Sequence, residues 1–260
     1  MTSVAGNAAP EPSDVPAADR ASNRAPGKGA DRVGTAVDGA PGAAADTADA
    51  IEVLGLVAAL EHQAFTRLAG DSTQAPDLEQ ALALSRFAAR CTERRDRVLA
   101  RVTELGGDPV AALGRFGDVL DDFDARTTPS SWSERLLKAY VGYGVADDFC
   151  RLVARGLDPD SRVLVAELLE DASHAELAVR ELDAVCAQDA VVSARLALWG
   201  RRLVGEALGV VQRLVQRPGV ARVLDRADVG TAPEQETPAT VFNELTAQHT
   251  RRMSRLHLTA

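Results

Sequence analysis

Long stretches of this chain place apolar residues three and four positions apart, which is the spacing of one face of an α-helix. Strict apolar–polar alternation, the mark of a β-strand, is nowhere long enough for a sheet. The pattern therefore predicts an all-α fold. The expected helices are residues 49–70, 77–105, 131–156, 158–182 and 189–216, with a last one after Thr237-Pro238.

Residues at the ends of these stretches support the same boundaries. Asp77 with Gln80, and Ser131 with Glu134, have the spacing of capping boxes at helix N-termini. Asp158-Pro159 is a third start signal. Glycine and proline residues mark the C-terminal ends of the helices, at Gly106-Gly107, Gly156 and Pro218-Gly219. Between the second and third long helices, residues 108–124 are expected to form a short helix with Phe116, Leu120 and Phe123 facing inward.

The N-terminal residues 1–48 have a different composition, dominated by Ala, Pro, Gly, Asp and Ser. Such a segment buries too little apolar surface to offset the entropy of ordering it, so we expect a disordered tail followed by one helical domain over 49–260. Its start has no basic patch followed by an apolar segment, so no secretory signal is expected.

The overall composition is that of a soluble globular protein, with a net charge of −9 and 46% hydrophobic residues. No apolar run approaches the roughly 18 residues that a membrane span requires. Cys91, Cys150 and Cys186 are an odd number and lie far apart, which favours neither a disulfide framework nor a zinc site. We expect a cytoplasmic protein.

Acidic residues and a histidine interrupt the apolar stripes. Glu61 lies in the middle of the first stripe, and Asp171 and His174 lie three residues apart in the fourth. Side chains three apart project from the same helical face and can hold one ion. A buried carboxylate without a partner costs several kcal/mol, so each of these acids needs a cation or a proton.

At these residues the chain resembles the ferritin-like superfamily, and specifically the bacterial group related to the tRNA hydroxylase that oxidises a prenylated, methylthiolated adenosine. The resemblance covers about residues 50–258. It is carried by Glu61, by the stretch TTPSSWSERLLKAYVGYGVADD (127–148), by Asp171-Ala-Ser-His174 and by LALWGRRLVGEAL (196–208). It implies a four-helix bundle, here with additional C-terminal helices. In that bundle helices one and three each give a carboxylate, and helices two and four each give an acid-x-x-His pair. These six ligands together hold two irons.

The chain departs from this pattern at half of the implied ligands. Where the second helix should present Glu and His, the alignment places Cys91 and Arg94. The acid expected in the third helix aligns with Tyr143, and Asp147 or Asp148, one turn later, is a possible substitute. Candidate metal ligands are therefore Glu61, Asp171 and His174, with Asp148 in addition, and the replaced positions are Cys91, Arg94 and Tyr143.

Arg94 brings a permanent positive charge to a site that has lost ligands and kept acids. A guanidinium can hold carboxylates with two donors at once. We therefore expect an ion pair of Arg94 with Glu61 and Asp171 in place of iron, with the Tyr143 hydroxyl as an added donor. Cys91 is expected to be a small buried filler, and His62, His249 and His257 are expected at the surface.

Two functions follow from this sequence. The first is a ferritin-like, hydroxylase-related protein with a reduced or absent metal site and a binding or structural role. The second is an iron-dependent, O2-activating hydroxylase of the tRNA-hydroxylase-like type, so enzymatic activity stays open. The sequence is compatible with a homodimer that forms through the 189–216 stretch. It is also compatible with a small-molecule or macromolecular partner. We do not expect nucleic acid or membrane binding, because Lys and aromatic residues are scarce and the chain is acidic. Arginines that could form a basic stripe are Arg201, Arg202, Arg213, Arg217, Arg222 and Arg226.

Overall fold

The computed structural model describes residues 41–170, 173–227 and 237–260, and every described element is a helix. All of these residues belong to one compact unit, residues 39–260. The helices are α1 (Pro41–Ser72), α2 (Leu78–Glu104), α3 (Pro109–Gly114), α4 (Asp121–Arg126), α5 (Trp132–Ala154), α6 (Pro159–Leu168), α7 (Ser173–Gln188), α8 (Ala190–Val215), α9 (Pro218–Arg226) and α10 (Thr237–Arg255).

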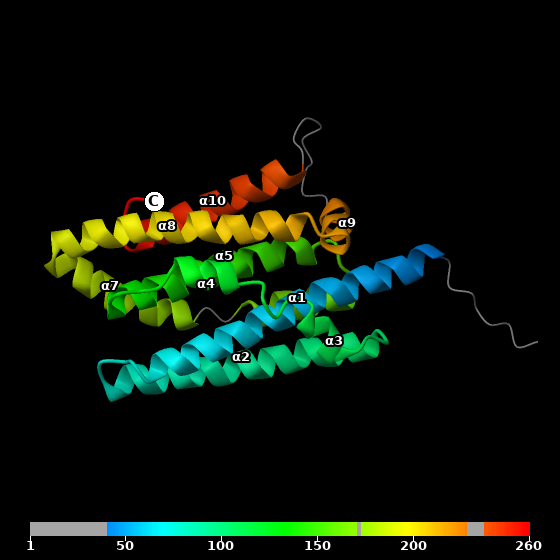
Figure 1. The fold of residues 1–260 in the computed structure, drawn as a ribbon, viewed down its shortest axis with the longest axis horizontal. Helices are drawn as coiled ribbons and strands as arrows, with labels where there is room; N and C mark the ends of the chain where they lie inside the picture. Colours follow the sequence, from blue (N-terminus) through cyan, green and yellow to red (C-terminus); the bar gives the residue numbers. More distant parts are fainter. Residues whose placement is uncertain (1–40, 171–172, 228–236) are drawn as a thin grey trace, which may run out of the picture. The chain divides into compact units, whose positions relative to one another are not determined.

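Helix α5 lies at the centre of the bundle. It packs against α1, α6, α7, α8, α9 and α10, while α1 and α2 form a long antiparallel pair beside it (Figure 1). Both sides of α5 are buried, and this central position explains why its sequence shows almost no polar face. The all-α fold predicted from the sequence is confirmed.

The predicted helix starts are confirmed in atomic detail. The Asp77 side chain accepts a hydrogen bond from the backbone N–H of Gln80 at 2.8 Å, and Ser131 accepts one from Glu134 at 3.2 Å. Asp158 caps α6 in the same way, through the backbone N–H of Ser161. Gly106 ends the α2 region with a φ of +80°, a conformation that glycine adopts without strain.

The first helix begins earlier than expected, at Pro41 rather than near Asp49. Its N-terminal extension is held by Asp49, whose buried carboxylate accepts hydrogen bonds from Arg222 at 2.6 Å and from Arg226 at 3.2 Å. Both arginines belong to α9, a helix that the sequence pattern did not predict. Pro218 ends α8 and begins α9, which is the position in a first turn that proline favours.

The predicted fourth helix is divided in the structure. Helix α6 ends at Leu168, and α7 begins at Ser173. Asp171 and Ser173 are residue types that favour helix N-termini over helix interiors, because their side chains compete for backbone hydrogen bonds. The expectation of one continuous helix over 158–182 was therefore wrong. The expected short helix at 108–124 is likewise divided, into α3 and α4, although Phe116 and Phe123 are buried as predicted.

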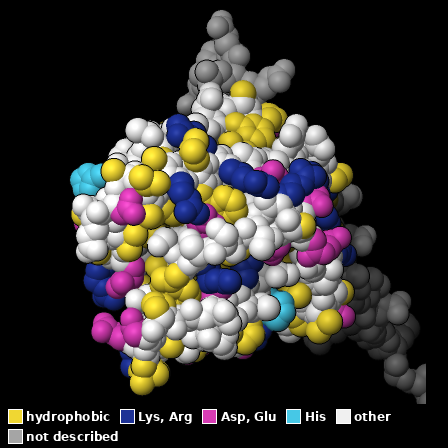
Figure 2. Space-filling model, turned by 60° about the vertical axis from the view of Figure 1, so that its left-hand side comes forward, with side chains coloured by type: hydrophobic (Ala, Val, Ile, Leu, Met, Phe, Trp, Pro, Cys, Tyr) yellow, Lys and Arg dark blue, Asp and Glu magenta, His cyan; other side chains and the backbone are white. Residues whose placement is uncertain are grey.

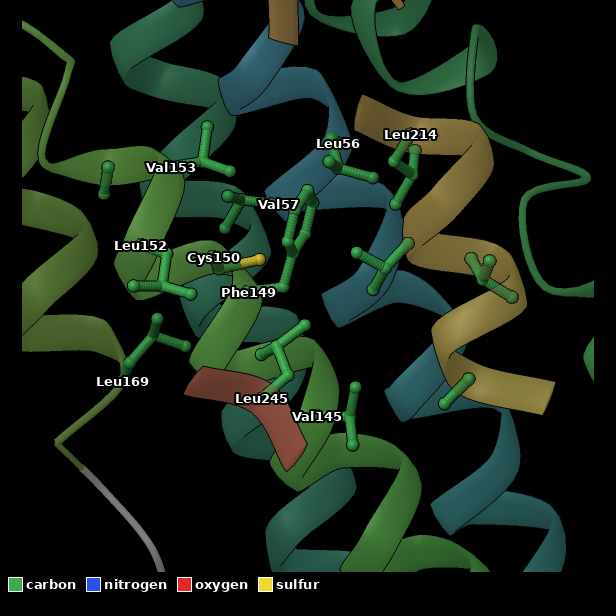
Figure 3. Packing of buried hydrophobic residues seen from close by; sticks show 14 of the residues in the cluster. Leu56, Val57, Val145, Phe149, Cys150, Leu152, Val153, Leu169, Leu214 and Leu245 are labelled. Carbon is green, nitrogen blue, oxygen red and sulfur yellow. The ribbon is translucent and has the colours of Figure 1, made fainter. Parts of the chain in front are cut away.

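The main hydrophobic core lies between α1, α5 and α8. Figure 3 shows Val57 of α1, Phe149 and Cys150 of α5, and Leu214 of α8 among the buried residues of this core. A second cluster lies further along the α1–α2 pair and includes Leu68, Cys91 and Tyr143. Within residues 41–170, 173–227 and 237–260, no helix has both the length and the apolarity that crossing a bilayer requires.

His249 is buried, with 2% of its surface exposed, so its expected place at the surface was wrong. It continues a stripe of α10 in which Val241, Leu245 and Met253 are fully buried, and this four-residue spacing is a signal that the sequence contains. Among the described residues, neither ring nitrogen of His249 has a hydrogen-bond partner. Burial lowers the pKa of the imidazole to about 4.

This lowered pKa predicts a loss of stability in acid. The unfolded chain takes up the His249 proton near pH 6.5 and the folded chain does so only near pH 4, so the contribution is complete above pH 6.5 and is lost as the pH falls. When the pH falls from 7.5 to 5, the free energy of unfolding of wild type, measured in urea, should decrease by about 2 kcal/mol relative to that of His249→Leu. His257→Asn, at an exposed position, should behave like wild type. A difference between wild type and His249→Leu that does not change with pH would contradict the assignment.

Candidate functional site

An ion pair joins the two longest helices in the middle of the bundle. Glu61 lies on the buried face of α1, and Arg94 faces it from α2, with Arg94 Nη2 3.0 Å from Glu61 Oε2. The side chains are 6% and 17% exposed, respectively. The expected pairing of Arg94 with Glu61 is thereby confirmed. Apolar neighbours at Val57, Ala58 and Ala64 set the inward orientation of Glu61, because they share its helical face.

Cys91 lies one turn before Arg94 on α2 and completes this cluster. Its sulfur is 3.3 Å from Arg94 Nη2. Burial raises the pKa of the Cys91 thiol to about 12, and the charge of Glu61 acts in the same direction. The thiol is therefore protonated at neutral pH, so Cys91 is a buried small side chain, as expected, and not a thiolate ligand.

The acid of α5 that lines the site is Asp147, not Asp148. Asp147 borders the same cavity as Glu61, and its charge contributes to the pKa of that carboxyl. Asp148 faces α10, where it pairs with Arg252, whose guanidinium also donates to the backbone carbonyl of Gly144 at 2.7 Å. A side chain at Gly144 would collide with Arg252. Asp148 is thus paired with Arg252 and does not line the cavity, so this geometry gives no support to its candidacy as a metal ligand.

Tyr143, at the other replaced ligand position, is buried next to the cluster. Its hydroxyl donates to the backbone carbonyl of Ala64 at 3.4 Å, one turn along α1 from Glu61. Burial raises the pKa of the hydroxyl far above its ordinary value. Tyr143 therefore enters the site as a neutral side chain.

The remaining two candidate ligands cannot be placed. Asp171 lies outside the described residues, and His174 belongs to α7 with a side chain that also lies outside them. Of the seven candidate and replaced positions, the structure brings Glu61, Cys91, Arg94 and Tyr143 together, and separates Asp148 from them.

An apolar cavity of about 60 Å³ adjoins the ion pair. The sequence pattern does not predict this cavity, since its walls come from distant segments of the chain whose approach depends on the packing. Its polar lining consists of Glu61, Arg67, Arg90, Cys91, Arg94, Tyr143, Asp147 and Cys150. Its apolar walls include Val57 and Leu60 of α1, Phe149 of α5, and Val210, Val211 and Leu214 of α8.

Burial shifts the pKa values of both members of the ion pair. Desolvation raises the pKa of the Glu61 carboxyl to about 7; Arg94 opposes this shift, and Asp147 adds to it. For Arg94, burial acts to lower the pKa of the guanidinium, but Glu61 and its other neighbours raise it above its ordinary value. Arg94 therefore stays charged, and Glu61 shares this environment either as a carboxylate or with a proton.

The described side chains do not fit a di-iron centre. Such a centre needs carboxylates and imidazoles as donors. Here a permanent cation contacts the Glu61 carboxylate, and the neighbouring thiol is protonated. Among the residues whose side chains are described, no group of three or more His, Cys, Asp or Glu side chains could hold a metal ion.

The raised pKa of Glu61 predicts a specific pH dependence of stability. Between about pH 4.5 and pH 7 the folded chain holds the Glu61 proton while the unfolded chain has released it, so stability falls as the pH rises. When the pH rises from 5 to 8, the free energy of unfolding of wild type, measured in urea, should decrease by on the order of 2 kcal/mol relative to that of Glu61→Gln. Glu79→Gln, at an exposed position of α2, is the control and should keep the wild-type profile. Parallel profiles for wild type and Glu61→Gln would show that Glu61 is not desolvated.

Comparison with known protein families agrees with this architecture. Residues 45–224 match the family described as "Ferritin-like domain, actinomycetes". A search of curated proteins finds no match. The matched residues include both partners of the ion pair and all of α2, α5 and α8. Because the match extends over more than half of the sequence, the chain belongs to this ferritin-like family.

Proposed function

We propose that this protein is a metal-independent member of the ferritin-like fold with a binding role, in which the Glu61–Arg94 ion pair takes the place of bound iron. The observation that carries this proposal is the contact of 3.0 Å between the guanidinium and the carboxylate. It lies where the resemblance to the hydroxylase group implies metal ligands, and it supplies the positive charge that a metal would otherwise bring.

Electrostatics favour a guanidinium over a metal at these residues. Arg94 is covalently fixed to α2 and stays charged at all working pH values. A cation that entered beside it would be repelled, and in a buried site this repulsion is weakly screened. Arg94 stands at one position of the missing acid-x-x-His pair. The same substitution therefore removes a metal ligand and supplies a cation in its place.

Descent from the tRNA-hydroxylase-like group is part of the same proposal, but tRNA binding is not. Four of the six arginines of the expected basic stripe are engaged by acids of this chain. The pairs are Arg213 with Asp122 at 3.6 Å, Arg217 with Glu52 at 3.0 Å, Arg222 with Asp49 at 2.6 Å and Arg226 with Asp46 at 2.9 Å. On the face drawn in Figure 2, Lys and Arg side chains lie interspersed with Asp and Glu. This arrangement offers little free positive charge to a phosphate backbone.

A cytoplasmic location and self-association also belong to the proposal. All three cysteines are free thiols, which suits a reducing compartment. Val191 and Leu198 are exposed on α8, 70% and 63% respectively, and lie seven residues apart on one face of that helix. This is where a second copy would pack.

The competing function is an iron-dependent hydroxylase that uses Asp171 and His174 with Glu61. Iron content decides between the two. Protein purified from iron-supplied cells should contain well under one iron per chain, whereas a di-iron hydroxylase would contain about two together with the absorption band of an oxo bridge. The second result would refute the proposal.

A restored ligand pair sharpens this test. Cys91→Glu with Arg94→His recreates the acid-x-x-His spacing on the inward face of α2 and removes the guanidinium, so this variant should take up more iron than wild type. Thr92→Glu with Arg95→His places the same chemistry one residue further, about 100° around the helix, and should not. Equal iron in the two variants would remove the argument that the ion pair occupies the metal position.

A further inference from the structure

The cavity beside the ion pair has a mainly apolar lining that includes a few charged groups. Glu61, Arg94 and Asp147 border it, together with Arg67 and Arg90. Its apolar walls include Val57, Phe149 and Val211 and other aliphatic side chains of α1, α5 and α8. Ligand sites in proteins commonly have this composition, with apolar walls and a few fixed polar groups that orient the ligand.

One carboxylate oxygen in the cavity lining has unused capacity to accept hydrogen bonds. Glu61 Oε2 is buried and lines the cavity, yet among the described residues it accepts no hydrogen bond of good geometry. Its contact with Arg94 is an ion pair at 3.0 Å, which leaves Oε2 able to accept a hydrogen bond from the cavity. A buried acceptor left in this state costs about 1–3 kcal/mol, and more when it is charged. A donor that reaches Oε2 from the cavity would recover that free energy.

The size of the cavity limits what can enter. A volume of about 60 Å³ holds about four water molecules, or an organic molecule of about five non-hydrogen atoms. A nucleoside is far larger.

We infer that this cavity binds a small, mainly apolar molecule with one hydrogen-bond donor, such as a short-chain alcohol, whose donor reaches Glu61 Oε2 while its carbon atoms contact Val57, Phe149 and Val211. This inference rests on the proposed function, since iron at Glu61 would use the same carboxylate.

Two isomers separate the donor from the apolar contacts. Butan-1-ol and diethyl ether contain the same atoms, but only the alcohol donates a hydrogen bond. Each is titrated into iron-free protein at pH 8.5, where Glu61 is ionised because its pKa is about 7. Binding is followed by the methyl resonances of Val57 and Val211. The methyl groups of Val110, which is 80% exposed and is not part of the cavity lining, report non-specific solvent effects.

Wild type should bind the alcohol about tenfold more tightly than the ether, which corresponds to one charge-assisted hydrogen bond. In the double variant Glu61→Leu/Arg94→Leu the ratio should fall to about one, since the acceptor is gone and no charge is left without its partner. Before titration, the unfolding midpoint of the double variant in urea is compared with that of wild type, to check that the variant is folded. The comparison of the two isomers in wild type stands alone if that variant does not fold.

Equal affinities in wild type would overturn the inference, as would shifts that do not saturate or that Val110 shares. Iron content measured on the same preparation keeps the two proposals apart. Iron-free protein that does not distinguish the isomers refutes the ligand inference alone, whereas protein with about two irons per chain refutes the proposed function.

Discussion

A carboxylate that leaves water for the middle of a helical bundle needs either a cation or a proton. Glu61 has access to both. Arg94 contacts it at 3.0 Å, and burial raises its pKa to about 7, so that a proton is within reach near neutral pH. This balance ties α1 to α2 at mid-length and fixes which faces of the two helices meet. Helix α5 packs against α1 from this pair and against α8 on its other side.

In the proposed function, the same interaction takes the place of the metal chemistry that this fold can support. Bundles of this architecture build cofactor sites from inward-facing side chains on neighbouring helices. Here the inward positions of α2 hold a thiol that keeps its proton and a guanidinium that keeps its charge. Beside them lie the paired carboxylate of Glu61 and an apolar cavity, a combination that small-molecule sites in proteins commonly have.

Local signals in the sequence were sufficient for most of the fold. The caps at Asp77, Ser131 and Asp158 were predicted because a side-chain acceptor and a free backbone N–H meet within a single turn. The pairing of Arg94 with Glu61 followed from the apolar stripes, which place both residues inward, and from the resemblance, which sets them opposite each other.

The errors arose where the choice depended on packing. Asp147 and Asp148 point about 100° apart, and both directions from α5 are buried because helices surround it, so periodicity alone cannot choose between them. His249 was misplaced because a histidine was treated as polar although its position continued an apolar stripe. The break after Leu168 was missed since a helical stripe on both sides of a short interruption looks continuous.

The coupling between Glu61 and Arg94 tests the central claim most directly. A double-mutant cycle with Glu61→Leu, Arg94→Leu and the double variant, measured by urea unfolding at pH 8, isolates the interaction free energy of the pair. The account predicts a coupling on the order of 2 kcal/mol or more, with the double variant more stable than either single variant. A coupling near zero would contradict it, because the guanidinium would then not be what balances the buried carboxylate.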